Sequence, residues 1–328
     1  MEYLSFKYRN NIYAKASQVN NEIRNMCLLL GIDSPKDTVT YLYAEKFAEE
    51  VYNLSDGRIR IQIYTDAQLG TDRQMLRSIL QNSNIHFIAQ TTAPQAPFMP
   101  KLSVFDIPLA YMDINDLRNA IDNKEFYEEI SNVYREGGYK LLGIADQLFR
   151  HMTSNKEIRS TDDFRGIRIR TIQNRNHEAF WSNLGATVIP LPVSEVYRNL
   201  ELGLIDAQEN PYEVIAALNL YDVQDYVINT YHLPHLLTLI TSDKFYNSLT
   251  PTEKAIMDLA AKRATVYARE KADERFEEIK NFLIDKGMTI IDLPYEVKLD
   301  LRLKSMPVYE RIYQVIGDVE LIKSYFGQ

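Results

Sequence analysis

The sequence is poor in the residues and runs that several large protein classes require. It contains one cysteine, Cys27, which excludes an internal disulfide framework and a cysteine zinc site. Because Cys27 lies in the apolar run 26–30, we expect it to be a small buried side chain. No apolar run approaches the roughly 18 residues of a membrane-spanning helix. These absences favour a globular chain with an ordinary apolar core.

Basic residues are fewer than acidic residues. The chain has 37 lysine and arginine residues against 45 aspartate and glutamate residues, which gives a net charge of −8 at pH 7. Sequence-independent binding to nucleic acid needs a concentrated basic face that releases counterions from phosphates. We therefore predict no nucleic-acid partner, although a local basic pocket is compatible with this charge.

The local motifs of three common enzyme classes are also missing. The sequence has no Gly-x-Gly-x-x-Gly fingerprint, no phosphate-loop Gly-Lys-Ser/Thr and no Gly-x-Ser-x-Gly elbow. Of the five histidines, His232 and His235 form the one metal candidate, but Pro234 between them prevents helical ligand spacing. We predict no catalytic residues, no metal and no cofactor.

The length of 328 residues suits two lobes or one large α/β domain, and two lobes are the better prediction. Residues 58–64 alternate polar and apolar side chains as a half-buried strand does, and residues 41–54 have helical spacing. This alternation of strands and helices predicts a sheet that is at least partly parallel. Such sheets bind ligands beyond the carboxyl ends of their strands, so the loops 65–73 and 90–97 are candidate walls of a site.

A second βαβ-like set follows in residues 167–205, which makes a second lobe plausible. After it, Thr250-Pro251-Thr252-Glu253 combines a threonine cap, a proline at the first helical position and a glutamate at the third. The helix that begins there can run to about Lys286, a length of roughly 54 Å at 1.5 Å per residue. A single lobe is rarely that wide, so this helix either lies across both lobes or is broken.

Residues 149–211 carry the side chains best suited to hold a carboxylate. Arg150 and Arg170 lie at the ends of strand-like segments, and the rigid guanidinium fork suits two-pronged recognition of carboxylate. Asn210, before a proline, can donate an amide hydrogen to a ligand. The alternatives are a surface or salt-bridge role for each arginine and local backbone bonding for the asparagine. Spacing alone leaves both interpretations open.

Short motifs follow one another along nearly the whole chain. In order they are Gly57-Arg58-Ile59-Arg60-Ile61, Gln68-Leu69-Gly70, Val104-Phe105-Asp106-Ile107-Pro108, Arg150 with Thr153-Ser154-Asn155, Gly166-Ile167-Arg168-Ile169-Arg170, Leu184-Gly185-Ala186, Ser194-Glu195-Val196-Tyr197 and Asp206-Ala207-Gln208-Glu209-Asn210-Pro211. One such motif is weak, but this many in this order are specific. Over about residues 26–320 the chain resembles the substrate-binding proteins of the tripartite ATP-independent periplasmic (TRAP) transporters, of the DctP type.

The resemblance implies an α/β periplasmic-binding-protein fold with two lobes that close on a small organic acid. Crossing strands and a long helix would join the lobes. It also implies that Arg170 pairs with the ligand carboxylate, that Arg150 is a second arginine contact and that Asn210 lies beside the carboxylate. The implied parts are an atypical extension (1–24), lobe I (25–147 and about 236–270), lobe II (148–235 and about 276–303), the long helix (250–286) and a C-terminal helical segment (304–328).

The resulting prediction is a monomeric receptor without catalysis that delivers an organic acid to the TRAP membrane permease subunits. We favour a sugar acid such as a uronate, whose hydroxyl groups need polar partners. The expected polar partners are Thr71, Asp72, Arg73, Gln90, Thr91, Gln147 and Gln173. A C4-dicarboxylate is the alternative and would need a second cation, for which Arg73 or Arg150 could serve. A rival of another class is an enzyme that acts on carboxylates, with Asp206 or Glu209 as its base.

The sequence departs from the family pattern at several positions. Ser83 and His86 stand where the family often has glycine and an acidic residue, and Val193 stands where a phenylalanine lies near the ligand. The first 24 residues lack the apolar centre of about 7–15 residues that an export signal has. We expect that the natural leader has been removed or replaced, or that the start of the chain is misassigned. The predicted location remains periplasmic.

Overall fold

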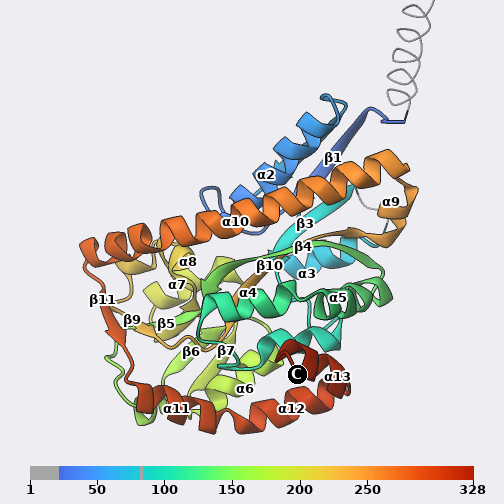
Figure 1. The fold of residues 1–328 in the computed structure, drawn as a ribbon. Coiled ribbons are helices and arrows are strands. Elements are labelled where there is room, and N and C mark those ends of the chain that lie inside the picture. The colour runs from blue at the N-terminus through green and yellow to red at the C-terminus, as the bar shows by residue number, and fades with distance from the viewer. Residues whose placement is uncertain (1–21, 82–83) are drawn as a thin grey trace, which may run out of the picture.

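The computed structural model describes residues 22–81 and 84–328, and within them the strands form two separate sheets (Figure 1). The first sheet has the strand order β2-β1-β3-β10-β4. Its strands β1, β2 and β3 are parallel, whereas β10 is antiparallel to both of its neighbours. The bounds are β1 (Met26–Gly31), β2 (Ile59–Tyr64), β3 (Ile85–Thr91), β4 (Tyr139–Phe149) and β10 (Pro234–Ser242).

The second sheet has the strand order β11-β9-β5-β8-β6-β7. Strand β6 runs parallel to β7 and β8, and β5 runs antiparallel to β8 and β9. The bounds are β5 (His151–Ser154), β6 (Arg168–Thr171), β7 (Thr187–Pro190), β8 (Ala207–Asn210), β9 (Tyr226–Asn229) and β11 (Thr289–Asp292). Both sheets are therefore partly parallel, as the alternation of strands and helices predicted.

Helices surround both sheets (Figure 1). Those that precede β4 are α2 (Val39–Leu54), α3 (Asp72–Ser78), η1 (Pro100–Asp106), α4 (Ile114–Asp122) and α5 (Lys124–Glu136). Those that follow β5 are η2 (Thr161–Phe164), α6 (Arg175–Asn183), η3 (Val193–Glu195), α7 (Val196–Glu201), α8 (Tyr212–Ala217), η4 (Leu220–Asp222) and α9 (Asp243–Ser248). The last helices are α10 (Pro251–Asp285), α11 (Tyr295–Lys304), α12 (Met306–Ile316) and α13 (Val319–Tyr325).

The long helix α10 crosses both lobes, as Figure 1 shows. It begins where the sequence predicted, because Thr250 and Glu253 form a capping box in which each side chain accepts a hydrogen bond from the other residue's backbone N–H (3.2 and 2.9 Å). Ala260, Ala264 and Ala268 recur every four residues on its buried face, so its backbone can lie close to α2. The expected lobe-spanning helix is thus confirmed.

The chain passes between the sheets at two neighbouring places, besides the passage through α10 from β10 to β11. One residue, Arg150, separates β4 in the first sheet from β5 in the second. The return runs from β9 to β10, and there Arg150 N–H donates to Leu233 O at 2.8 Å. The two crossings therefore lie side by side and form a short joint between the lobes. The exact lobe boundaries stay a prediction.

The core is continuous on the side of the C-terminal helices. One buried cluster includes Ile88 and Ile144 of the first sheet and also Ile169 of the second sheet. Tyr309 of α12 belongs to the same cluster and donates its hydroxyl hydrogen to Pro108 O at 2.5 Å. The C-terminal segment therefore fastens the two lobes together instead of lying apart from them.

Two predictions concern the N-terminal part of the chain, namely Cys27 and the extension 1–24. Cys27 is exposed, so the prediction of a buried thiol was wrong. Strand side chains alternate between faces, and here Leu28 and Leu30 point into the core while Cys27 points outward. The predicted extension 1–24 lies, except for residues 22–24, outside the described residues, as does Ser83. No helix in the described parts of the chain is long and apolar enough to span a membrane.

Candidate functional site

A cavity of about 430 Å³ lies between the two sheets. Volumes of about 300–1,000 Å³ are typical of sites for small molecules. The first lobe contributes the ends of β1 and β3, the turn after β2 and the start of α3, and the second lobe contributes the ends of β6, β7 and β8. The cavity thus occupies the crevice beyond the carboxyl ends of the parallel strands, where α/β sheets bind ligands.

Nine of the ten side chains predicted for the site line this cavity. They are Thr71, Asp72, Arg73, Gln90, Thr91, Arg150, Arg170, Gln173 and Asn210. Their segments are far apart in the sequence, so the fold brings them together. Whether each one contacts a ligand stays a prediction.

Arg170 presents a buried cationic edge to the cavity. In β6, alternation turns Ile169 into the core and Arg170 toward the cavity, and its residue is 2% exposed. Its Nε and Nη2 donate to Leu191 O at 2.9 and 2.6 Å, while Nη1 has no hydrogen-bond partner among the described residues. Burial, together with the charge of Arg150 and against the opposing charges of Glu209 and Asp33, lowers the pKa of Arg170 to about 10, so the group stays charged at neutral pH.

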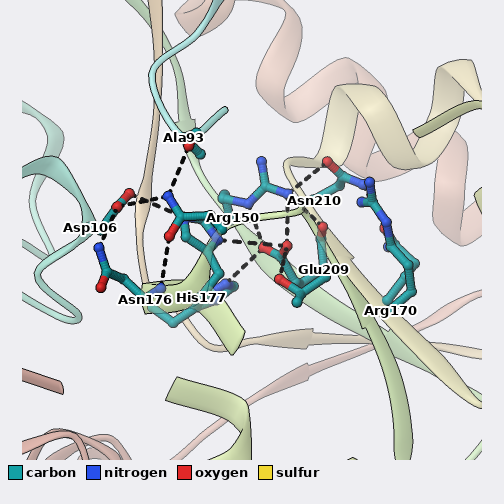
Figure 2. Close-up of polar contacts among 12 residues, drawn as sticks. Ala93, Asp106, Arg150, Arg170, Asn176, His177, Glu209 and Asn210 are labelled. Carbon is teal, nitrogen blue, oxygen red and sulfur yellow. Dashed lines mark hydrogen bonds and ion pairs between the residues drawn. The ribbon is translucent and has the colours of Figure 1, made fainter. Parts of the chain in front are cut away.

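Arg150 is held by acceptors inside the protein. Its Nε and Nη2 both bind the carboxylate of Glu209, and Nη2 also donates to Glu209 O at 2.7 Å and to Asn210 Oδ1 at 3.0 Å. Its Nη1 lies 2.5 Å from His235 Nδ1. Figure 2 shows this cluster beside Arg170. Arg150 lines the cavity, but Glu209 largely neutralises its charge.

Glu209 is the centre of the polar network behind the cavity (Figure 2). It is fully buried and accepts hydrogen bonds from Thr171 Oγ1 at 3.0 Å and His232 Nε2 at 3.1 Å besides those from Arg150. Burial alone would raise its pKa, but the charge of Arg150 and the hydrogen bonds of His177 and His232 hold the pKa of Glu209 well below its usual range. Glu209 is therefore an ionised structural anion.

Asn210 ends β8 and lies next to both arginines. Its Oδ1 accepts from Arg150, and its Nδ2 donates to Gln208 Oε1 at 2.6 Å. An amide nitrogen has two hydrogens, so one N–H of Asn210 is left for a ligand. This orientation follows from Arg150, which fixes the carboxamide oxygen on its own side.

The opposite wall of the cavity carries two carboxyl groups. Asp33 follows β1, and Asp72 is the first residue of α3 and is 8% exposed. Asp33 lies close enough to Asp72 for the two carboxyl groups to affect each other's ionisation. Burial raises the pKa of both, and the charge of Asp33 raises that of Asp72 further, to well above its usual range. With its amide oriented to suit its neighbours, Gln90 donates to Asp72 O and Oδ1 at 3.2 and 3.3 Å.

Arg73 connects the two walls. Its Nη2 donates to the backbone carbonyl of Gln173, which follows β6 in the second lobe. Asn174 adds a second interlobe contact, because its Nδ2 donates to Ala93 O at 2.8 Å. The two lobes therefore touch beside the cavity at residues 173–174.

Gln147 lies elsewhere than the sequence suggested. Among the described residues, it contributes to a small second pocket beside the joint and not to the cavity. Its Nε2 donates to Glu213 Oε2 at 2.5 Å and is 3.4 Å from Thr40 Oγ1. The next residue, Leu148, has a left-handed backbone (φ 61°), so strand alternation counted back from Arg150 does not predict the direction of Gln147. Gln147 is therefore not among the residues that we expect to contact the ligand.

Asp33 and His235 line the cavity but were missed by the sequence analysis. Asp33 could have been found, because it stands directly after an apolar strand, where loop residues reach a crevice. His235 gave no such signal, since only tertiary contact with Arg150 brings it to the wall. In the described chain, no group of three or more potential ligands is placed to hold a metal.

Glu213 should make the stability of the protein depend on pH. It lies on α8 and accepts hydrogen bonds from Val39 N of α2 (2.8 Å) and from Gln147, which ties the second lobe to the first. Burial raises its pKa to about 7, although Val39 N–H and Arg275 oppose the shift. A raised folded-state pKa favours the protonated form, so this contribution is complete below the unfolded pKa of about 4.5 and is lost as pH rises through 7.

We expect Glu213→Gln to remove this pH dependence while preserving the shape of the side chain. Between pH 4.5 and 8, the wild type should lose about 3 kcal/mol of unfolding free energy relative to the variant. Urea unfolding at four pH values in this range measures the difference. Glu128→Gln, a change at an exposed glutamate on α5, is the control. Identical pH profiles for the wild type and Glu213→Gln would contradict the expectation.

Comparison with known proteins gives matches along most of the chain. A family model described as "Bacterial extracellular solute-binding protein, family 7" matches residues 30–315. The C4-dicarboxylate-binding protein DctB of Bacillus subtilis is 28% identical over 293 residues, which cover 88% of this chain and 82% of that protein. The sialic acid-binding periplasmic protein SiaP of Vibrio cholerae is 24% identical over 290 residues, which cover 88% and 89% of the two chains.

The fold of this chain is also similar to the folds of solved structures over most of its length. The sugar acid binding protein DctPAm of Advenella mimigardefordensis, in complex with galactonate, has a TM-score of 0.88 at 25% identity, with 93% of this chain and 98% of that chain covered. A TRAP periplasmic solute binding protein from a Polaromonas species, bound to D-erythronate, has a TM-score of 0.86 at 25% identity and covers 92% and 98%. The two-lobed fold with its long helix is therefore confirmed.

Proposed function

The chain belongs to bacterial extracellular solute-binding protein family 7, and from that premise we propose that it captures a small organic acid outside the cytoplasm and delivers it to a TRAP membrane permease. Membership confirms the resemblance to TRAP substrate-binding proteins that the sequence motifs indicated. The family consists of solute receptors, and the proposal adds that this chain has no catalytic activity, acts as a monomer and works in the periplasm.

The observation that carries the proposal is the free edge of Arg170. A charged guanidinium is buried in a cavity between two lobes, and its Nη1 has no acceptor within the described chain. A ligand carboxylate placed there would accept from Nη1 and from the spare N–H of Asn210. Such charge-assisted bonds in a desolvated site are about twice as strong as neutral ones. Both groups belong to the second lobe, so the ligand would favour closure through additional contacts with the first lobe, which only the closed form supplies.

A sugar acid is the favoured ligand. Thr71, Gln90 and Thr91 offer polar groups to hydroxyls, and two similar proteins of known structure hold galactonate and D-erythronate. The alternative, a C4-dicarboxylate, has a named relative in DctB and would need a second cation. Glu209 already neutralises Arg150, so Arg73 is the remaining candidate for that second cation.

The enzyme alternative has little support from its proposed bases. Glu209 is ionised and fully occupied by internal donors. Asp206 pairs with Arg168 at 2.6 Å on the surface and, among the described residues, is not part of the cavity lining. Tight binding of an acid without its chemical conversion, followed by NMR over hours, would separate a receptor from an enzyme.

A thermal-shift screen tests the proposal and its ligand class. The panel contains uronates, aldonates, sialic acid and succinate, with the parent neutral sugars as matched controls. A ligand at 100 times its dissociation constant should raise the unfolding free energy by about 2.7 kcal/mol. We expect acids to stabilise the protein and neutral sugars to leave it unchanged. Stabilisation by the neutral sugars alone, or by no compound, would count against a carboxylate receptor.

A further inference from the structure

The wall opposite Arg170 has an unusual chemistry for a receptor of acids. Asp33 and Asp72 place two carboxyl groups in one cavity, and neither has a basic side chain as a hydrogen-bond partner among the described residues. Their described neighbours are the Ser34 hydroxyl, at 3.2 Å from Asp33 Oδ1, and the Gln90 amide, at 3.3 Å from Asp72 Oδ1. These are neutral donors.

Two adjoining buried carboxyl groups cannot both ionise cheaply. Burial raises the pKa of both carboxyl groups, and the charge of Asp33 raises the pKa of Asp72 further. Ionisation of both groups at once is therefore disfavoured. Carboxyl oxygens accept hydrogen bonds from hydroxyl groups, a protonated carboxyl group donates one, and an ionised carboxyl group repels another anion.

Arg170 marks the part of the cavity where a negatively charged group of a ligand is expected to bind. Arg170 is 2% exposed, its Nη1 has no partner in the described chain, and its charge is close enough to Asp33 to affect the carboxyl group. The cavity of about 430 Å³ is lined by both groups, so one small molecule can contact both walls. The site thus has the Arg170 cation at one wall and a carboxyl pair at the other, where the neighbouring Arg73 is engaged by the backbone carbonyl of Gln173.

We propose that Asp33 and Asp72 together determine specificity, by binding the hydroxyl end of a polyhydroxy monocarboxylate and rejecting ligands that carry a second carboxylate. This inference rests on the proposed function, because it assumes that Arg170 takes the first carboxylate. It narrows the ligand class from small organic acids to monoacids with hydroxyl groups. A C4-dicarboxylate, which has a carboxylate at each end, is excluded.

The test compares two ligands that differ at one end. An aldonate and the aldarate of the same sugar, galactonate and galactarate, share a carbon chain but end in a hydroxymethyl group and a carboxylate respectively. Calorimetry at pH 7.5 gives both dissociation constants for the wild type. We expect the aldarate to bind at least about tenfold more weakly, because built-in charge repulsion is an effective way to reject a competitor.

Amide substitutions then show whether Asp33 and Asp72 are the residues that disfavour the second carboxylate of the aldarate. Asp33→Asn, Asp72→Asn and the double variant remove negative charge with little change of shape, so the aldarate-to-aldonate ratio of dissociation constants should fall toward one. Asp162→Asn is the control, because Asp162 is exposed, pairs with Arg165 and is not part of the cavity lining among the described residues. The control should keep the wild-type ratio. Urea unfolding verifies that each variant is folded.

The outcomes separate the inference from the function on which it rests. If the wild type binds aldarate as tightly as aldonate, the inference is overturned, but the receptor of organic acids stands. If it rejects aldarate and every folded pair variant keeps the wild-type ratio, the inference is also overturned. If neither acid nor any other monoacid binds, both proposals fail. The wild-type comparison holds even if a variant does not fold.

Discussion

Replacing Arg170 with alanine is expected to weaken acid binding by about 30-fold to about 5,000-fold, which corresponds to about 2–5 kcal/mol. The ligand carboxylate would lose its charged partner in a buried site, and the spare Asn210 amide cannot replace it. Arg170→Lys should give an intermediate loss, because lysine keeps the charge but cannot donate to Leu191 O and to the ligand through one rigid fork. Isothermal titration calorimetry with the best ligand of the thermal-shift screen measures both variants.

Arg168→Ala is the matched control for this experiment. Arg168 lies two residues earlier on β6 and pairs with Asp206 at the surface, so strand alternation would put both arginines on one face, but only Arg170 reaches the cavity. We expect near-wild-type affinity for Arg168→Ala. Near-wild-type affinity in both Arg170 variants would disprove the role assigned to Arg170.

The ligand-free stability of Arg170→Ala distinguishes lost binding from lost folding. Burial lowers the pKa of Arg170 to about 10, which means that the folded protein disfavours its charge relative to the unfolded chain. Removing the side chain should therefore not destabilise the ligand-free protein through lost charge. A receptor that buries such a cation without a carboxylate as its hydrogen-bond partner among the described residues is prepared to bind an anion.

Sequence signals were sufficient wherever local chemistry decides structure. The Thr250 capping box marked the start of α10, and strand alternation marked β2. The rule that ligands meet the carboxyl ends of parallel strands placed the loops around Thr71 and Gln90 at the cavity. Each of these inferences depends on residues that are close together in the chain.

The inferences that failed or were missed depend on tertiary contacts. Cys27 lies on the face of β1 opposite the buried Leu28 and Leu30 and is exposed, which the apolar run alone did not reveal. Gln147 turns to Glu213, which lies 66 positions later, and Arg150 is neutralised by Glu209, which lies 59 positions later. Such pairings follow from the assembled fold and cannot be counted from local spacing. The first lobe's Asp33 could have been assigned by the strand-end rule.

Glu209→Gln is expected to lower the free energy of unfolding by about 3–5 kcal/mol, because it leaves the buried guanidinium of Arg150 without its counter-charge. That is a large part of the 5–15 kcal/mol that is typical of folded proteins. The exposed Glu157, which pairs with Arg159, is the control, and Glu157→Gln should change stability by no more than about 0.5 kcal/mol. Urea unfolding at pH 7 measures both variants.

The pH dependence identifies charge as the cause of the loss. The pKa of Glu209 is held well below its usual range in the folded protein, so its contribution is present above the unfolded pKa of about 4.5 and is lost as pH falls below that value. The gap between the wild type and Glu209→Gln should therefore stay constant from pH 7 to about 5 and narrow when the pH is lowered from about 4.5 toward 3. A gap that stays constant down to about pH 3 would point to lost hydrogen bonds instead.

A second substitution distinguishes the contribution of the Arg150–Glu209 ion pair to stability from the contribution of the contacts around it. Breaking a buried pair leaves an uncompensated charge, whereas replacing both partners by neutral side chains of similar size is often close to neutral. Arg150→Met combined with Glu209→Gln should thus be more stable than Glu209→Gln alone. If the double variant is instead the less stable of the two, Arg150 contributes mainly through its contacts with Asn210 and His235. In that case the network behind the cavity stabilises the protein mainly by keeping the site in shape, and neutralisation of charge contributes less.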